Sequence, residues 1–530
     1  MAVTEADIRS PLADALRQIL GNDNVLTDAD NRRFYSSDVY REAAPAEIVI
    51  RPGGTEELQR AVKAATHAGY AVFPRGGGLS YTDGYLPDRQ KAVMIDLLRL
   101  KKIIEINTED MYVTVEPGVS WAELYEALKV KGVRTPYFGA LPGLYSTVGG
   151  AMSQNSLFFG SGTYGTAAEQ CLGLEIVLAD GRLIKTGSGA TPFNPTPFFR
   201  TYGPDLTGLF LGDTGALGLK VKITLKLIRT PAVTKYASFA FDEPEQIAAV
   251  MSEIARQQLA VECFGFDPFL QAQRLKRAGL VKDIKSLAGV ARSGRGLLDG
   301  VKEAARVALA GRRMFEGVAY SMHLVIEGRD EAVVDSQLAA ARQIATGAGG
   351  KEIENSLPKI MRGTPFVEPQ SMLGPDGQRW VPIHALVPHS RANKLLHAVH
   401  DYFDSHNDLL EKNRIEWGYL LSTCGAQAFL MEPVFFWLDA RHYYHERYLG
   451  ADYISKLKTY PADTQARDAV HELRRGLAKM FMEMGATHFQ IGKSYMYREG
   501  REPETYKLLE ALKDYVDPQR LMNPGSLGLK

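Results

Sequence analysis

"PRGGGLSYTDGYLPD", residues 74–88, places three consecutive glycines directly after a predicted strand. Glycine has no Cβ, so such a turn can bend sharply and bring its backbone N–H groups against an oxyanion. The preceding stretch, EIVIRPGGTEELQRAVKAATHAGYAVF at residues 47–73, predicts strand, turn, helix and strand, with helical spacing at Leu58, Val62 and Ala65. The glycines therefore close a βαβ unit, and we expect them to form a phosphate-binding loop.

A second glycine-rich stretch strengthens this expectation. It reads LPGLYSTVGGAMSQNSLFFGSGTYG, residues 141–165, and offers the hydroxyl groups of Ser146 and Thr147 and the amide of Asn155. The first loop is not a dinucleotide fingerprint, because loop-like residues follow it where a helix would begin, and it lacks a Walker A lysine. Two such loops in one unit could hold the two ends of a large diphosphate cofactor. A flavin-free binding or scaffold protein would require both to be accidental.

Composition limits the alternatives. A chain of 530 residues predicts two or three domains, and 62 basic against 62 acidic residues give no field that would attract nucleic acid. Three widely spaced cysteines predict neither a disulfide framework nor a cysteine metal site, and we expect no metal. The N-terminus lacks a signal-peptide core, and no window has the apolar length of a membrane span. The expected protein is soluble and cytoplasmic, with peripheral attachment to a membrane as the open alternative.

The pattern of predicted elements changes along the chain. Strands and helices alternate to about residue 230, which predicts an α/β unit that includes a strand pair around the Asp180-Gly181 turn. Longer helical patterns between short strands follow over residues 235–480 and predict a second, α+β domain. The tail is a helix stopped by Asp517-Pro518, with a Gly- and Pro-rich end.

As a set, these motifs resemble the vanillyl-alcohol oxidase and p-cresol methylhydroxylase (PCMH-type) family of FAD-linked oxidoreductases. The resemblance covers PRGGGLS, the segment from Pro142-Gly143 to Tyr164-Gly165, LEIVLADGRLIKTG (174–187), GPDLTGLFLGDTGALG (203–218) and the closing DP…NPG. It implies an α+β, two-domain flavoprotein: a PCMH-type FAD-binding domain at 1–230, a substrate or cap domain with an antiparallel sheet at 235–480, and a segment, 481–530, that returns to the FAD domain.

The resemblance also implies which residues hold FAD. The expected cofactor-binding residues are Arg75, Gly76, Gly77, Gly78, Leu79, Ser80, Pro142, Gly143, Ser146, Thr147, Gly149, Gly150, Tyr164, Gly165, Gly215 and Asn523. Some relatives attach FAD through a histidine in the glycine loop, but Leu79 stands there. Others use a histidine in the second domain, and RWVPIHALVP (379–388) is similar to that segment, so His384 is the candidate for a covalent link. A histidine satisfied by a backbone carbonyl is the equal alternative, and His389 is a weaker candidate.

Phenol-oxidising relatives stabilise a phenolate with a Tyr-Arg pair and a tyrosine after the glycine loop, and an aspartate near the flavin assists. Tyr85 resembles that tyrosine, but Phe489-Gln490 and Ser153 stand at the other places. A neutral glutamine cannot compensate a phenolate as arginine does. Lys493 and Tyr495 are candidates to take over, and so is Glu432, whose apolar strand would raise its carboxyl pKa. The structural alternative for Lys493 and Tyr495 is a solvated surface face. For Glu432 it is an edge position or a buried salt bridge.

The expected reaction is hydride transfer to flavin N5 from an aromatic alcohol or para-substituted phenol, in an apolar slot. The expected lining of that slot is Tyr85, Tyr137, Phe138, Tyr145 and Phe489. The alternative is an FAD-dependent D-2-hydroxy-acid dehydrogenase of the lactate or glycolate kind, although its His-Gly-Asp-Gly-Asn and Glu-His-Gly strings are absent. The electron acceptor could be dioxygen, a cytochrome or a quinone, and a homodimer is possible.

Overall fold

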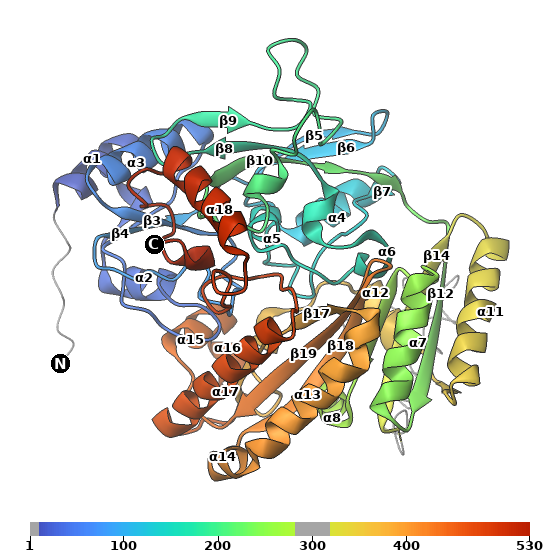
Figure 1. Cartoon of the computed structure of the whole chain (residues 1–530). Helices are drawn as coiled ribbons and strands as arrows, with labels where there is room; N and C mark the ends of the chain where they lie inside the picture. Colours follow the sequence, from blue (N-terminus) through green and yellow to red (C-terminus); the bar gives the residue numbers. More distant parts are fainter. Residues whose placement is uncertain (1–9, 281–317) are drawn as a thin grey trace.

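The computed structural model describes residues 10–280 and 318–530. Figure 1 shows an N-terminal region, residues 10–229 in blue to green, beside a cap region, residues 233–483, built on one large sheet. The C-terminal helix α18 (Pro503–Val516) lies back on the N-terminal region, next to its strands (Figure 1).

The first sheet of the N-terminal region contains the predicted βαβ unit. Its strands, in spatial order, are β1 (Val25–Leu26), β2 (Ile48–Ile50), β4 (Ala92–Asp96) and β3 (Ala71–Arg75). Both β2 and β3 run parallel to β4, which lies between them. Helices α1 (Pro11–Leu20) and α3 (Thr55–His67) share a core with this sheet, and the predicted helical face of Leu58, Val62 and Ala65 is fully buried there. Strand β3 ends at Arg75, so the three glycines begin where the parallel sheet stops.

A second sheet differs from the predicted α/β alternation, because its strands are all antiparallel. Its spatial order is β5 (Ile103–Asn107), β6 (Tyr112–Val115), β10 (Leu219–Lys226), β8 (Cys171–Val177) and β9 (Leu183–Lys185). Short turns reverse the chain between β5 and β6 and between β8 and β9, where Gly181 has φ +81°. Helix α4 (Trp121–Lys129) begins in a capping box between Ser120 and Glu123. Helix α5 (Val148–Gln154) follows the second glycine-rich stretch.

The cap region contains the expected antiparallel sheet. Its strands are, in order, β15 (Lys351–Ile353), β12 (Val233–Phe241), β14 (Tyr320–Gly328), β13 (Glu262–Phe266), β18 (Glu416–Cys424), β19 (Ala428–Trp437) and β16 (Arg379–Pro382), with β17 (Ala385–Pro388) also paired to β19. Four helices cover one face: α7 (Pro244–Arg256), α11 (Glu331–Gly347), α13 (Ala392–Ser405) and α17 (Thr464–Glu483) (Figure 1). Helix α8 (Pro268–Leu280) packs on the other face.

Alternation along β19 divides its side chains between these two faces. Phe429, Met431 and Phe435 join the core under the helices, whereas Leu430 and Phe436 belong to a smaller cluster on the opposite face. The period of two is that of a strand with both faces covered. The face that carries Leu430 and Phe436 is the one turned toward the N-terminal region.

The C-terminal segment is tied to the first sheet. Met522 forms a bridge with Val72 of β3, and the ammonium of Lys513 donates to the carbonyls of Ala216 and Met522 at 2.7 and 2.8 Å. The remaining short elements are η1 (Asn22–Asn24), α2 (Ala29–Tyr35), β7 (Val133–Arg134), α6 (Ser161–Tyr164), η2 (Ala167–Gln170), η3 (Gly208–Phe210), β11 (Ile228–Arg229), α12 (Ser356–Gly363), η4 (Pro369–Met372), η5 (His389–Arg391), α14 (Asn407–Lys412), α15 (Tyr443–Leu449), α16 (Ala451–Ile454) and η6 (Ser526–Gly528).

Candidate functional site

A cavity of about 280 Å³ lies between the two regions. From the N-terminal region it is lined by residues 76–81, Gly84, Tyr85, Pro142, Ser146, Thr147, Gly149–Ala151, residues 153–154 and 156–158, and Thr214. From the cap region and the C-terminal segment it is lined by Leu270, Gln273, Arg274, Trp380, Leu420, Leu430, Glu432, Phe436, Phe489 and Gln490, among others. The two glycine-rich stretches that the sequence singled out therefore face one cavity.

The two glycine loops approach each other too closely for side chains. A Cβ on Gly77 would lie 1.9 Å from the carbonyl oxygen of Tyr145, and one on Gly76 would lie 2.6 Å from Thr147 Oγ1. Gly78 has φ +76°, a left-handed conformation that side chains disfavour. Only glycine allows the two loops to lie this close together. The first loop therefore lines the cavity with backbone atoms that no side chain covers.

The polar groups around this bare backbone fit FAD. Three buried side-chain atoms that line the cavity, Ser146 Oγ, Gln154 Oε1 and Thr214 Oγ1, have no hydrogen-bond partner among the described residues. Buried polar atoms are ordinarily paired, so such a set indicates partners that a ligand supplies. Backbone amides beside hydroxyl groups are the donors that a diphosphate uses.

Most residues expected to bind FAD line this cavity. They are Gly76, Gly77, Gly78, Leu79, Ser80, Pro142, Ser146, Thr147, Gly149 and Gly150. Arg75, Gly143, Tyr164, Gly165, Gly215, His384 and Asn523 do not line it.

Four of these seven have an evident structural role. A Cβ on Gly143 would meet Phe366, one on Gly165 would meet Glu169 and one on Gly215 would meet Pro74 of β3, so these glycines permit close packing. The carboxamide of Asn523 donates to the carbonyls of Gly84 and Thr214 at 2.7 and 2.6 Å. Asn523 thus holds two residues that line the cavity, although it does not line the cavity itself. Tyr164 lies instead near Arg134, whose guanidinium carbon is 5.8 Å from the ring centroid.

His384 does not present a free nitrogen to the cavity. Its backbone N–H donates to the hydroxyl of Tyr495 at 2.9 Å, and that hydroxyl donates to Nδ1 at 3.0 Å. Nε2 donates to the carbonyl of Phe489 at 2.7 Å, and the ring of Phe489, which lines the cavity, stacks on the imidazole at 3.7 Å. Burial holds the pKa of His384 well below its ordinary value. This geometry matches the structural alternative and opposes a flavin bond.

Three residues expected to be catalytic have other roles in this structure. Tyr85 lines the cavity, but its hydroxyl lies 2.8 Å from the carbonyl of Gly78 and 2.9 Å from that of Ser37. The ammonium of Lys493 does not line the cavity and donates to Leu86 O at 2.6 Å. Burial lowers the pKa of Lys493 to about 8. Tyr495 holds His384. Each of these polar groups is thus hydrogen-bonded within the fold.

Of the five aromatic residues expected to line a substrate slot, two line the cavity and three do not. Tyr137 and Phe138 are buried in the core of the second sheet, and the side chain of Tyr145 is 41% exposed. Phe489 and Tyr85 do line the cavity, together with aromatic residues that the prediction missed, namely Phe158, Trp380 and Phe436. The period-two alternation of β19 places Leu430, Glu432 and Phe436 on one face, and that signal could have identified this wall.

The apolar end of the cavity holds a carboxyl and a guanidinium. Glu432 on β19 and Arg274 on α8 both line it, and so does Tyr81, whose ring is edge-on to Trp380 at 5.9 Å. Burial raises the pKa of Glu432 to about 7, against the opposing effect of Arg274. Burial also holds the pKa of Tyr81 well above its ordinary value, and the charge of Glu432 adds to this. A group that can take a proton near neutral pH and a fixed cation therefore face one apolar slot.

Gln490 also lines the cavity, in a left-handed conformation with φ +50°.

Over the described ranges, 10–280 and 318–530, no cluster of three or more His, Cys, Asp or Glu side chains could hold a metal ion. Within the same ranges no helix has the length and apolarity needed to cross a bilayer.

Comparison with known proteins identifies two parts of the chain. Residues 46–187 match the FAD binding domain family, and residues 463–527 match the C-terminal domain of the FAD linked oxidases. The chain therefore contains a PCMH-type FAD-binding domain followed by an FAD-oxidase C-terminal domain, and the expectation of FAD as cofactor is confirmed.

Curated relatives match the chain over part of its length. D-lactate dehydrogenase [cytochrome], mitochondrial, from Arabidopsis thaliana is 30% identical over 47% of this chain and 44% of its own length. Glycolate oxidase subunit GlcD from Bacillus subtilis is 28% identical over 47% of this chain and 51% of its own length. The chain spans about half the length of these relatives.

Solved structures match over nearly the whole chain. A substrate complex of p-cresol methylhydroxylase has a TM-score of 0.74 at 18% identity, and covers 98% of this chain and 96% of that one. A 4-ethylphenol oxidase from Gulosibacter chungangensis has a TM-score of 0.69 at 17% identity, with the same coverage. At this identity the similarity concerns the fold, and it confirms the predicted two-domain PCMH-type architecture.

Proposed function

We propose that the chain is an FAD-dependent oxidoreductase that oxidises a D-2-hydroxy acid with an apolar side chain to the 2-oxo acid. The observation that carries this proposal is that Arg274 and Glu432 line the same cavity, near enough for the guanidinium to act electrostatically on the carboxyl. The names of the sequence relatives, D-lactate dehydrogenase and glycolate oxidase, support a hydroxy acid over the aromatic alcohol that the sequence motifs first favoured.

Each part of such a substrate has a complementary group. The guanidinium of Arg274 would bind the carboxylate, and a planar, permanently charged group suits that task. The carboxylate form of Glu432 would accept the hydroxyl proton, because its pKa of about 7 leaves it partly ionised at neutral pH. Leu420, Leu430 and Phe436 would bury the side chain and exclude water. FAD, when bound, supplies the two-electron acceptor for the hydride on the carbinol carbon.

An aromatic alcohol or para-substituted phenol, as in the vanillyl-alcohol oxidase branch, is the second candidate. It is favoured by the aromatic side chains that line the cavity, Phe158, Trp380, Phe436 and Phe489. Gln490 makes a phenolate less suitable, since a neutral amide cannot compensate its charge.

Anaerobic reduction distinguishes the candidates. The purified flavoprotein would be mixed with D-lactate, D-2-hydroxy acids carrying longer aliphatic or aromatic side chains, their L enantiomers, benzylic alcohols and alkylphenols. We expect bleaching of the flavin absorbance by the bulkier D-2-hydroxy acids. Bleaching by the alcohols or phenols alone would reject this proposal in favour of the second candidate. Reoxidation of the reduced protein by dioxygen, a cytochrome and a quinone analogue would then identify the class of acceptor.

A further inference from the structure

Arg75, the last residue of β3, is a buried cation with no carboxylate within 4 Å among the described residues. The residue is 2% exposed, and its Nε has no hydrogen-bond partner in that part of the chain. Aromatic rings surround the guanidinium instead: its carbon lies 5.1, 4.9, 5.6 and 6.0 Å from the centroids of Phe34, Tyr35, Tyr85 and Tyr444. Cation–π contacts compensate only part of the cost of burying a charge.

This cation lies directly behind the glycine loop. A Cβ on Gly78 would be 2.2 Å from Arg75 Nη2 and 2.7 Å from the hydroxyl of Tyr444. Gly78 itself lines the cavity, whereas Arg75 does not. One layer of backbone therefore separates the guanidinium from the space that the loop encloses.

Two tyrosines of the cap-region helix α15 hold the same loop. The hydroxyl of Tyr444 donates to the carbonyl of Gly78 at 2.5 Å, and that of Tyr448 donates to the carbonyl of Gly77 at 2.9 Å. Burial holds the pKa of Tyr444 well above its ordinary value, so it remains a donor. Neither tyrosine lines the cavity, so both carbonyls are held by groups outside it.

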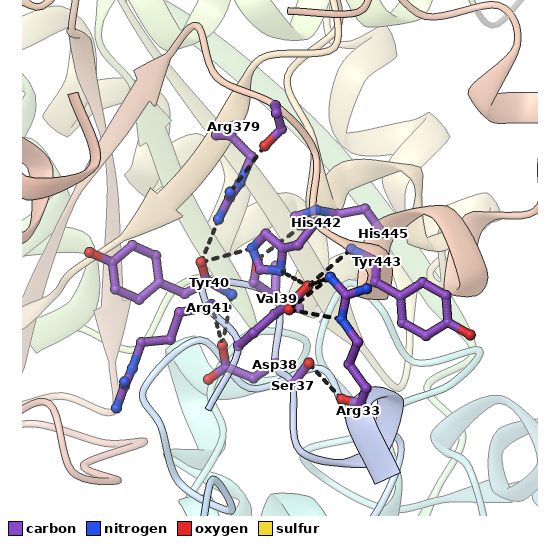
Figure 2. Close-up of polar contacts among 12 residues, drawn as sticks. Arg33, Ser37, Asp38, Val39, Tyr40, Arg41, Arg379, His442, Tyr443 and His445 are labelled. Carbon is purple, nitrogen blue, oxygen red and sulfur yellow. Dashed lines mark hydrogen bonds and ion pairs between the residues drawn. The ribbon is translucent and has the colours of Figure 1, made fainter. Parts of the chain in front are cut away.

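Helix α15 also holds the N-terminal strap, residues 37–42, which packs on the residues after the loop. Figure 2 shows His442 and His445 beside the strap, where their Nε2 atoms donate to the carbonyls of Tyr40 and Val39 at 3.1 and 3.0 Å, while Arg379 donates to Tyr40 as well. In turn the N–H of Val39 donates to Ser80 O at 3.1 Å. The cap region thus supports the loop both directly and through the strap.

We propose that α15 of the cap region completes the FAD diphosphate site: Tyr444 and Tyr448 fix the carbonyls of Gly78 and Gly77 so that the loop amides face the diphosphate, and the guanidinium of Arg75 acts through the bare loop as its buried counter-charge. The buried carboxylate of Asp96 attracts Arg75 without pairing with it directly. An anion on the cavity side of Gly78 would add to this attraction, because electrostatic attraction is strong in a region of low dielectric constant. Tyr444, Tyr448 and Arg75 are positioning residues and need not touch the substrate.

The affinity of the flavin-free chain for FAD is measured by calorimetric titration. The unfolding temperature of the same flavin-free protein is measured in parallel. Removing one tyrosine hydroxyl, in Tyr444→Phe or Tyr448→Phe, should weaken FAD binding roughly three- to tenfold, the effect of one lost hydrogen bond. Arg75→Met should weaken it at least about tenfold, and Arg75→Lys should restore part of the loss because it keeps the charge. Tyr443→Phe is the matched control, since that ring lies against Arg33 and its hydroxyl contacts no loop carbonyl.

A purely structural role predicts a different pattern. FAD binding unchanged in Tyr444→Phe and Tyr448→Phe would overturn the proposal. So would an equal loss in Arg75→Lys and Arg75→Met, or a lower unfolding temperature of the flavin-free tyrosine variants without a loss of affinity. No substrate enters the titration, so its result stands apart from the proposed reaction, which fails only if the hydroxy acids do not reduce the flavin.

Discussion

The guanidinium of Arg134, in the N-terminal region, pairs with the carboxylate of Glu327, at the end of β14 in the cap sheet. Both side chains are buried, with 3% and 5% of their surface exposed. Glu327 also pairs with Arg362 on α12, and Arg362 pairs with Glu262 at 2.9 Å. Two arginines and two glutamates therefore form a buried network that joins the N-terminal region to the cap region.

Glu327→Gln should lower the free energy of unfolding by about 3–5 kcal/mol, because two buried guanidinium groups lose the carboxylate that they share. Urea unfolding measures this difference. Glu331→Gln is the control in the same region: Glu331 is 69% exposed, and its pair with Lys235 should contribute at most about 1 kcal/mol. Equal effects of the two substitutions would mean that the network does not join the regions energetically.

The sequence predicted the fold because its signals are local. The spacing of Leu58, Val62 and Ala65 defines a buried helical face whatever surrounds it, and the glycines after β3 mark the end of a strand. The antiparallel second sheet was missed, since strands and helices alternate along the chain there too and only the pairing differs.

The site was predicted less completely because it depends on pairings between distant segments. His384 has the sequence surroundings of an attachment site, yet its nitrogens are occupied by Phe489 and Tyr495, more than one hundred residues away (separations of 105 and 111). Arg274 lies on a helix with no motif around it, and only the folded chain brings it to Glu432. Glu432 itself was recognisable, as a carboxyl in an apolar strand.

Turnover should depend on pH through Glu432. Burial raises its pKa from 4.5 to about 7, and only the ionised form can accept the hydroxyl proton. We expect kcat/KM for the hydroxy acid to rise with pH, to reach half its maximum near pH 7 and to level off about one pH unit higher. Glu432→Gln should lower kcat/KM about a hundredfold or more and abolish this rise. Steady-state rates between pH 5 and 9 measure both, and a profile unchanged in the variant would exclude Glu432 as the base.

The same carboxyl should make stability depend on pH in the opposite direction. Because the folded-state pKa is raised, folding favours the protonated form, and stability is lost as pH rises from about 4.5 through 7. Relative to the parent chain, Glu432→Gln should therefore gain stability between pH 5 and pH 8. Thermal unfolding at these two pH values measures the gain.

Arg274→Met should raise KM for 2-hydroxy acids about tenfold or more, since one charge-assisted pair with the carboxylate is lost. It should leave benzylic alcohols, which lack a carboxylate, unaffected. Lys276→Met provides a control on the same helix, because the Lys276 side chain is 55% exposed and pairs at 3.7 Å with Asp376, outside the cavity lining. An equal loss for both substrate types would show that Arg274 shapes the cavity without binding a carboxylate.

FAD should be released when the purified protein is precipitated with acid. A covalent bond to His384 would need a ring nitrogen in the cavity, but Nδ1 accepts from Tyr495, Nε2 donates to Phe489 O, and the ring of Phe489 stacks on the imidazole. We therefore expect the yellow colour in the supernatant, measured by its absorbance. Because the imidazole supports Phe489, His384→Ala should lower stability by about 2–4 kcal/mol while its flavin is still released by acid. The conclusion would be reversed if the yellow colour stayed in the pellet of the parent protein but was released to the supernatant from His384→Ala.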